Sequence, residues 1–178
     1  MTESLDPLAV RLGAVLHARG LRLATAESCT GGWIAKVVTD IAGSSAWFDR
    51  GFVTYSNAAK ADLLGVATHT LQTHGAVSEP VVLEMAVGAL ARSQAQVAVA
   101  VSGIAGPDGG SEDKPVGTVW FAWAVPGAPP WARCLQFAGN RGEVRHRRCG
   151  SPSKGCWSGS RARLSPPHSA RPAAPAAP

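Results

Sequence analysis

No apolar run in this 178-residue chain approaches the roughly 20 residues that a membrane-spanning helix needs. Residues 1–11 carry acidic side chains and lack the apolar core of a secretory signal. These absences exclude an integral membrane protein with helical spans and predict a cytoplasmic location.

Cysteine patterns typical of metal sites are also missing. The chain has four cysteines, and no pair of them has CxxC spacing or matches a zinc-site template. The five histidines all lie outside the motifs described below. We therefore expect reduced thiols in a reducing compartment, and neither a metal nor another cofactor.

Charge is distributed unevenly along the chain. Residues 1–140 contain 9 Lys and Arg against 11 Asp and Glu, a net charge of −2, whereas residues 141–178 contain 8 against 1, a net charge of +7. The total of +5 therefore comes from the C-terminal part, and nucleic-acid binding would rest on that part alone.

The C-terminal part also loses hydrophobic periodicity and fills with Arg, Ser, Gly and Pro. Such a composition buries too little apolar area to offset the backbone entropy of folding, about 1–2 kcal/mol per residue. We therefore expect one folded domain over residues 1–145 and a disordered basic tail over residues 146–178.

Strand-like and helix-like segments alternate along the predicted domain, which favours an α/β layered fold. Strands are predicted by apolar, β-branched and aromatic runs at 21–26, 47–55, 97–101, 116–125 and 131–137. Helices are predicted at 8–20, 32–41, 58–64 and 79–95. A proline- and glycine-rich connection at 126–130 suits an antiparallel hairpin between the last two strands.

Two glycine-rich turns, at 26–32 and 102–110, each follow an apolar strand-like run. Small residues let a ligand approach the backbone, and a helix that starts at such a turn directs its free N–H groups at an anion. Tyr55 and Lys60 lie between the two turns in the sequence. Together these features indicate a site for an anionic small molecule.

Several short motifs resemble, in order, those of the CinA C-terminal domain family, which contains nicotinamide-nucleotide amidohydrolases. The resemblance covers about residues 6–145. The matching segments are TAESCTGG (25–32), GSSAWF (43–48), GFVTYSN (51–57) with Lys60, GAVS (75–78), SGIAGP (102–107) and KPVGTV (114–119).

The resemblance implies a three-layer α/β/α domain with a mixed sheet, in the stand-alone form of the family. It also implies hydrolysis of the carboxamide of nicotinamide mononucleotide, a pyridine nucleotide, to nicotinate mononucleotide and ammonia. The family normally ends in an amphipathic helix that packs on the sheet. Because the match stops near Arg145, we expect that helix to be lost and replaced by the tail.

Amide hydrolysis needs a nucleophile, a base and donors for the oxyanion. The sequence shows no evident Ser-His-Asp or Cys-His set, so a Ser–Lys arrangement is the most economical choice. Lys60 is the candidate base, which requires a lowered pKa. The resemblance favours Ser45 as nucleophile, leaves Ser28 as its rival, and gives Tyr55 a role in orienting the substrate or the base.

Other residues are expected to bind the substrate or its phosphate, and Glu27 is expected to be structural. Arg141 follows Asn140, where the family usually has aspartate. The predicted binding residues are Thr30, Gly31, Gly32, Ser102, Gly103, Gly106, Thr118 and Arg141.

Two other functions stay open at this point. Loss of the C-terminal helix would leave a nucleotide-binding or interaction protein without turnover. Nucleic-acid binding through the basic tail is disfavoured by the acidic domain. The sequence also leaves open whether the chain forms a homo-oligomer.

Overall fold

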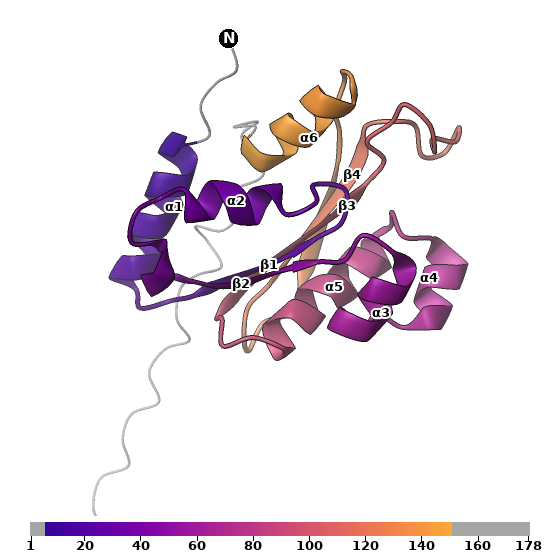
Figure 1. Cartoon of the computed structure of the whole chain (residues 1–178). Helices are drawn as coiled ribbons and strands as arrows, with labels where there is room; N and C mark the ends of the chain where they lie inside the picture. The colour runs from indigo at the N-terminus through magenta and orange to yellow at the C-terminus, as the bar shows by residue number, and fades with distance from the viewer. Residues whose placement is uncertain (1–5, 151–178) are drawn as a thin grey trace, which may run out of the picture.

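A computed structural model describes residues 6–150 of the chain, with side chains described up to Arg145. At its centre is a five-stranded sheet with the order β2-β1-β3-β4-β5 (Figure 1). β1 pairs in parallel with β2 and β3, whereas β4 is antiparallel to both β3 and β5, which confirms a mixed sheet. The strands are β1 (Leu23–Glu27), β2 (Phe48–Val53), β3 (Val97–Gly103), β4 (Thr118–Ala124) and β5 (Trp131–Gln136).

Helices cover both faces of this sheet, so the predicted three-layer α/β/α architecture is confirmed (Figure 1). One face carries α1 (Asp6–Ala18), α2 (Trp33–Thr39) and α6 (Arg141–Gly150). The other carries α3 (Asn57–Leu64), α4 (Thr68–His74) and α5 (Glu79–Ala91). Among the described residues, no helix combines the length and apolar character needed to cross a bilayer.

Side chains of β3 alternate between two hydrophobic clusters, one on each face of the sheet. Val97, Val99 and Val101 point into the cluster beneath α1 and α2. Ala98 and Ala100 face α5 instead, in a cluster that also contains alanines of the neighbouring strands. Because alanine side chains are short, α5 packs closely on the strands, and its Val81, Val82 and Met85 are fully buried there.

The helix α6 corrects the expectation that the C-terminal helix is lost, since it runs as far as Gly150. A reciprocal cap starts it: the N–H of Glu143 donates to Asn140 Oδ1 (3.1 Å), and the N–H of Asn140 donates to Glu143 Oε2 (2.9 Å). Asn140 therefore supplies the capping oxygen that an aspartate would offer. Val144 on this helix is fully buried. The predicted tail after Gly150 lies outside the described residues.

The helix α4 was not predicted, because the sequence of residues 66–77 indicated a connecting segment without regular structure. Its start is held by α5 rather than by its own sequence. Glu84 of α5 accepts the backbone N–H of Ala67 (2.7 Å) and the hydroxyl of Thr70 (2.7 Å).

The end of α3 lies close against α5 at Gly88. A Cβ at this glycine would overlap the carbonyl oxygen of Leu64. The same oxygen accepts a hydrogen bond from Arg92 (2.8 Å), which fixes the last turn of α3. The helix that carries Lys60 is therefore positioned by a close backbone approach that requires glycine at position 88.

We predict that Gly88→Ala destabilises the protein by about 1–3 kcal/mol, because the new methyl group overpacks against Leu64. In an exposed helix the same change would stabilise by about 1 kcal/mol, so the sign is diagnostic. Urea unfolding measures the effect. Val87→Ala, at a half-exposed neighbour on the same helix, is the control and should shift stability by less than about 0.5 kcal/mol. A Gly88→Ala variant as stable as the parent would contradict the argument.

Candidate functional site

The carboxyl ends of β1, β2 and β3 meet at one edge of the sheet, because the three strands are parallel. The chain leaves β1 through α2 on one face, and it reaches β3 through α3, α4 and α5 on the other (Figure 1). In such sheets, ligands bind at the point where the connections change face. Ser28, Tyr55 and Ser102 all lie at this edge, at or just after the strand ends.

Lys60 is the largest fully buried side chain of the described residues, with only 1% of its surface exposed. Its ammonium nitrogen Nζ donates to Ser28 Oγ (3.1 Å), to the carbonyl of Thr54 (2.9 Å) and to the carbonyl of Tyr55 (3.4 Å). Ser56 caps α3 by accepting the N–H of Ala59 (3.0 Å), so the helix carrying Lys60 starts directly after the end of β2.

Burial lowers the pKa of Lys60 from its ordinary value of 10.5, and the nearby Cys29 opposes this with a smaller raising effect. The acceptors around Nζ are one hydroxyl and two carbonyls, and none is a carboxylate that would hold the charged form. A lysine in this environment loses its proton at a lower pH than an exposed lysine does. It can then accept the proton of the serine hydroxyl that it contacts.

Ser45 does not lie near this lysine in the chain. It is exposed in a single helical turn (Ser44–Ala46) that precedes β2. The carbonyl of Trp47, two residues after Ser45, accepts a hydrogen bond from the N–H of Leu23 (2.8 Å). This turn therefore lies beside the start of β1. Ser28 follows the end of β1, and that strand's five residues cover about 17 Å at roughly 3.3 Å each. The serine in contact with Lys60 is therefore Ser28.

The turn after Ser28 owes its shape to Glu27, which is 1% exposed. Its carboxylate accepts the backbone N–H groups of Ile34 (3.0 Å) and Ala35 (2.8 Å) at the start of α2. Gly31 and Gly32 adopt positive φ values of 62° and 93°, which favour glycine. Glu27 thus has the structural role that the sequence suggested, and it occupies N–H groups that we expected to be free for an anion.

Thr30 is fully buried at the centre of this turn. Its hydroxyl has no hydrogen-bond partner within the described residues. A buried hydroxyl without a hydrogen-bond partner destabilises the folded state unless a ligand or a water molecule forms that hydrogen bond.

The second glycine turn is fixed by hydroxyl groups that bond within the protein. Ser102 Oγ donates to the carbonyl of Ala76 (2.7 Å), and Thr118 Oγ1 lies 2.7 Å from the carbonyl of Pro115. A Cβ at Gly103 would lie 2.7 Å from the carbonyl oxygen of Thr118, and Gly106 has a φ of 78°. These residues hold the shape of the turn in the arrangement seen here.

Arg141 lies on the exposed surface at the mouth of the same edge. One nitrogen of its guanidinium donates to the hydroxyl of Tyr55 (3.0 Å), and another donates to the carbonyl of Gly106 (2.7 Å). Tyr55 itself is 62% exposed. The structure therefore brings Arg141, Tyr55 and the second glycine turn together, as a positively charged rim.

Two contributors to this edge were missed by sequence reasoning. The carbonyl of Thr54 accepts from Lys60, but a backbone group carries no signal in the sequence. Arg145 donates to the carbonyl of Thr30 (3.0 Å). Its spacing of four residues from Arg141, one helical turn, could have indicated that both arginines share a face.

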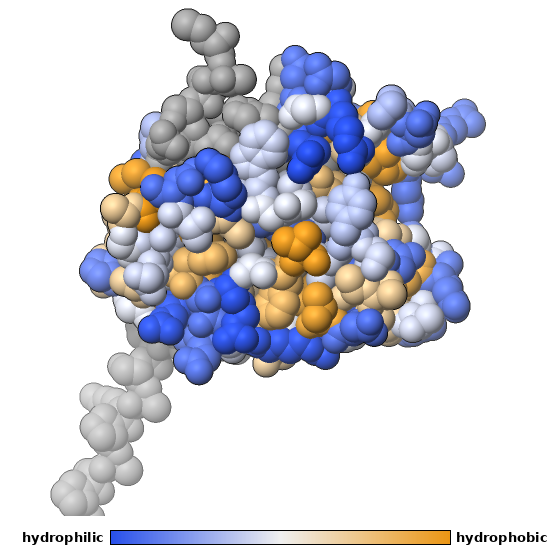
Figure 2. All heavy atoms as spheres, in the orientation of Figure 1, coloured by the Kyte–Doolittle hydropathy of each residue, from blue (hydrophilic) through white to orange (hydrophobic). Residues whose placement is uncertain are grey.

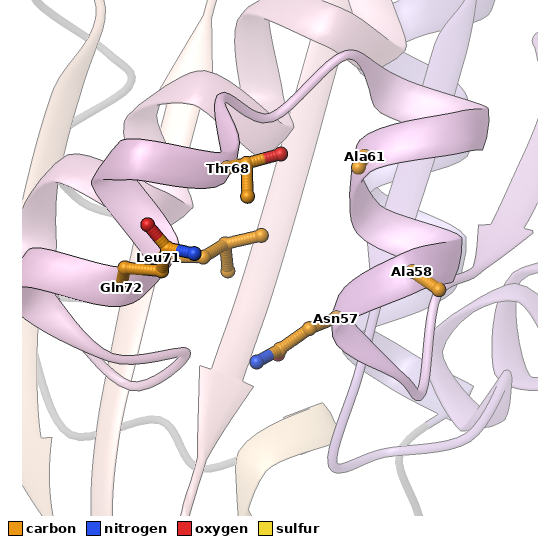
Figure 3. A pocket seen from close by; sticks show the side chains of 6 residues that line it. All are labelled: Asn57, Ala58, Ala61, Thr68, Leu71 and Gln72. Atoms are coloured by element: carbon orange, nitrogen blue, oxygen red, sulfur yellow. The ribbon is translucent and has the colours of Figure 1, made fainter.

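A separate cavity of about 280 Å³ opens between α3 and α4 (Figure 3). None of the predicted site residues lines it. Its lining residues are Asn57, Ala58, Ala61, Thr68, Leu71 and Gln72. In the space-filling view, hydrophilic side chains gather over α6, at the edge where the arginines lie (Figure 2). Among the described residues, no three His, Cys, Asp or Glu side chains form a cluster that could hold a metal ion.

Comparison with known proteins gives the family of the chain. Residues 5–151 match the CinA C-terminal domain model. The chain belongs to the CinA C-terminal domain family. It is 62% identical over 148 residues to the nicotinamide-nucleotide amidohydrolase PncC of Escherichia coli K12, covering 83% of this chain and 90% of that protein. The PncC of Pseudomonas putida is 53% identical over 145 residues, which cover 82% and 90% of the two chains.

A solved structure of a family member has the same fold. The crystal structure of the competence/damage inducible protein CihA from Agrobacterium tumefaciens superposes with a TM-score of 0.80 at 50% sequence identity. The match covers 82% of this chain and 89% of that one. The fold and the chain order of the motifs are thus those of the CinA C-terminal domain family.

The buried Lys60 predicts a specific dependence of stability on pH. Because its pKa in the folded protein lies below the ordinary value of 10.5, the unfolded chain binds more protons between the two values. The free energy of unfolding of the parent, relative to Lys60→Met, should therefore increase as pH rises from 7 towards 10. Urea unfolding at several pH values measures this difference. Parallel curves for the parent and Lys60→Met would contradict the prediction.

Proposed function

We infer that this protein is a nicotinamide-nucleotide amidohydrolase that converts nicotinamide mononucleotide to nicotinate mononucleotide and ammonia. Support comes from its 62% identity to an enzyme of that name, over 90% of the enzyme's length. The observation that carries the mechanism is the 3.1 Å contact between Lys60 Nζ and Ser28 Oγ at the sheet edge. The hydrogen-bond acceptors of Lys60 are a hydroxyl and two carbonyls, and none of them carries a negative charge.

In the proposed reaction, neutral Lys60 takes the proton of Ser28 as Oγ attacks the carboxamide carbon. The tetrahedral intermediate then collapses: the C–N bond breaks, and Lys60 returns the proton to the leaving nitrogen, which departs as ammonia. A serine ester remains. Lys60 next removes a proton from water, which attacks the ester carbonyl and restores the Ser28 hydroxyl with release of the carboxylate product.

The first glycine turn supplies the groups that would stabilise the oxyanion. The hydroxyl of Thr30, which has no hydrogen-bond partner among the described residues, lies just after the nucleophile in the chain, as do those backbone N–H groups of the turn that do not bond within it. Gly32, which lacks a side chain, lets the substrate approach the backbone.

We assign the phosphate of the substrate to the rim formed by Arg141 and Tyr55. Arg141 carries a permanent charge and lies on the exposed side of the edge, within hydrogen-bond distance of the Tyr55 hydroxyl. In this assignment Ser102, Gly103, Gly106 and Thr118 shape the wall of the crevice through their bonds to the protein.

The nucleophile is assigned to Ser28 rather than Ser45 on distance alone, so a matched pair of variants tests it. We predict that Ser28→Ala and Lys60→Met each lower kcat for ammonia release at least about a thousandfold. Ser45→Ala should stay within about threefold of the parent, because it lies at the opposite end of β1. Ammonia release from nicotinamide mononucleotide is the measurement. A loss in Ser45→Ala with retention in Ser28→Ala would transfer the role to Ser45.

The reaction should also follow the protonation of Lys60. We predict that kcat/KM rises with pH along an acid limb whose midpoint lies below the ordinary lysine value of 10.5, since burial favours the neutral base. Initial rates across pH 5–10 give the profile, with Lys36→Met as the matched lysine control. An unchanged rate over that interval would speak against Lys60 as the base.

A binding protein without turnover is the alternative, and the same ammonia assay distinguishes the two. That alternative was raised because the C-terminal helix was expected to be lost. The helix α6 is present, and its arginines contact both glycine turns. The cytoplasmic location remains a prediction, and the oligomeric state stays as open as the sequence left it.

A further inference from the structure

Helix α6 contacts all three segments that form the proposed site. Arg141 reaches Tyr55 and Gly106, while Arg145, one helical turn later, reaches the first glycine turn at Thr30. The buried Val144 anchors the helix between these two arginines. Figure 1 shows α6 beside α2, and the two helices are in contact.

Arg145 holds the first glycine turn from two directions. Its guanidinium donates to the carbonyl of Thr30 (3.0 Å), and its central carbon lies 5.7 Å from the centroid of the Trp33 ring. This is the distance of a cation–π contact. A Cβ at Gly31 would lie only 3.3 Å from the same guanidinium, so the side chain packs on the open face of that glycine.

The grip on Thr30 is transmitted to Ser28 through the backbone of the turn. The N–H of Gly31 donates to the carbonyl of Ser28 (3.0 Å), and the N–H of Trp33 donates to the carbonyl of Thr30 (3.3 Å). Ser28 is itself tied to the sheet by its N–H, which donates to Val101 (3.0 Å). One end of the turn is therefore fixed in the sheet and the other is held by Glu27 at the start of α2, while Arg145 restrains the middle of the turn at Thr30 and Gly31.

We propose that Arg145 is a positioning residue that keeps the Ser28 hydroxyl within reach of Lys60 by restraining the turn from Ser28 to Trp33, without touching the substrate. The inference rests on the proposed function. It separates the two arginines of α6 by role: Arg141 meets the phosphate, whereas Arg145 acts on the nucleophile from behind the turn.

The test compares Arg145→Gln and Arg145→Lys with Arg133→Gln, a control at an exposed arginine of β5. We expect Arg145→Gln to lower kcat by about tenfold to a hundredfold, because small misplacements of reacting groups have effects of this size. KM for nicotinamide mononucleotide should stay within twofold. Arg145→Lys should retain an intermediate kcat, since it keeps the charge but loses the planar fork, and Arg133→Gln should equal the parent.

A readout without the nucleotide distinguishes positioning from substrate binding. Modification of Ser28 by phenylmethylsulfonyl fluoride, followed by mass spectrometry, reports the reactivity of the hydroxyl alone. We expect its rate to fall in Arg145→Gln in proportion to kcat. If instead KM rises while the modification rate is unchanged, Arg145 binds the substrate and the proposal is overturned.

Thermal unfolding of the full chain shows whether each variant is folded. Should Arg145→Gln fail to fold, Arg145→Lys and Trp33→Leu, which removes only the ring, decide the matter. A reduced modification rate at an unchanged melting temperature supports positioning, and parent-like rates in both variants overturn it. Absence of ammonia release from nicotinamide mononucleotide by the parent would instead refute the proposed function, so the two failures can be told apart.

Discussion

The burial of one amine organises this molecule. Lys60 is enclosed where α3 leaves β2, and its three hydrogen bonds join the loops that follow β1 and β2. Removing an ammonium group from water is costly unless its protons are bonded or it gives one up. The two carbonyls and the hydroxyl around Nζ accept its hydrogen bonds but supply no negative charge. Because the ammonium form is buried without a counter-charge, the pKa of Lys60 is lowered. The close contact of α3 with α5 at Gly88 keeps that lysine in place.

The helices on the two faces contribute differently to the site. On the face with α3 and α5, α3 carries the buried Lys60, and the alanines beneath α5 let that helix pack close to the strands. The face with α2 and α6 shapes the turn that carries Ser28, through Glu27 from within and Arg145 from outside. The carboxyl ends of β1, β2 and β3 therefore lie between a helical layer that carries Lys60 and one that contacts the turn after β1.

The strands β1, β3 and β4 were predictable because they are mostly apolar, and β2 and β5 because they contain aromatic residues. The strong helix α5 was predictable because a serine and a proline mark its start. The helix α4 was not, since its start is held by Glu84 from another helix, a contact that local sequence does not encode. The helix α6 was misjudged because its arginine-rich sequence resembles a tail, although Asn140 and Glu143 form a capping pair. The site shows the same limit. Lys60 was chosen as a candidate from its neighbours in sequence, whereas the Ser28 hydroxyl that it contacts is 32 residues away and comes close because β1 and β2 are parallel.

The carboxylate of Glu27 has one more consequence, for electrostatics over longer range. It is an anion that the protein itself places at the beginning of α2, so the partial positive charge of that helix end is already neutralised. If Arg141 receives the phosphate as proposed, dissolved ions weaken its field within about 10 Å at 0.1 M salt. The proposed function then implies that binding of the nucleotide varies with ionic strength, whereas a proton transfer at the buried Lys60 is screened much less.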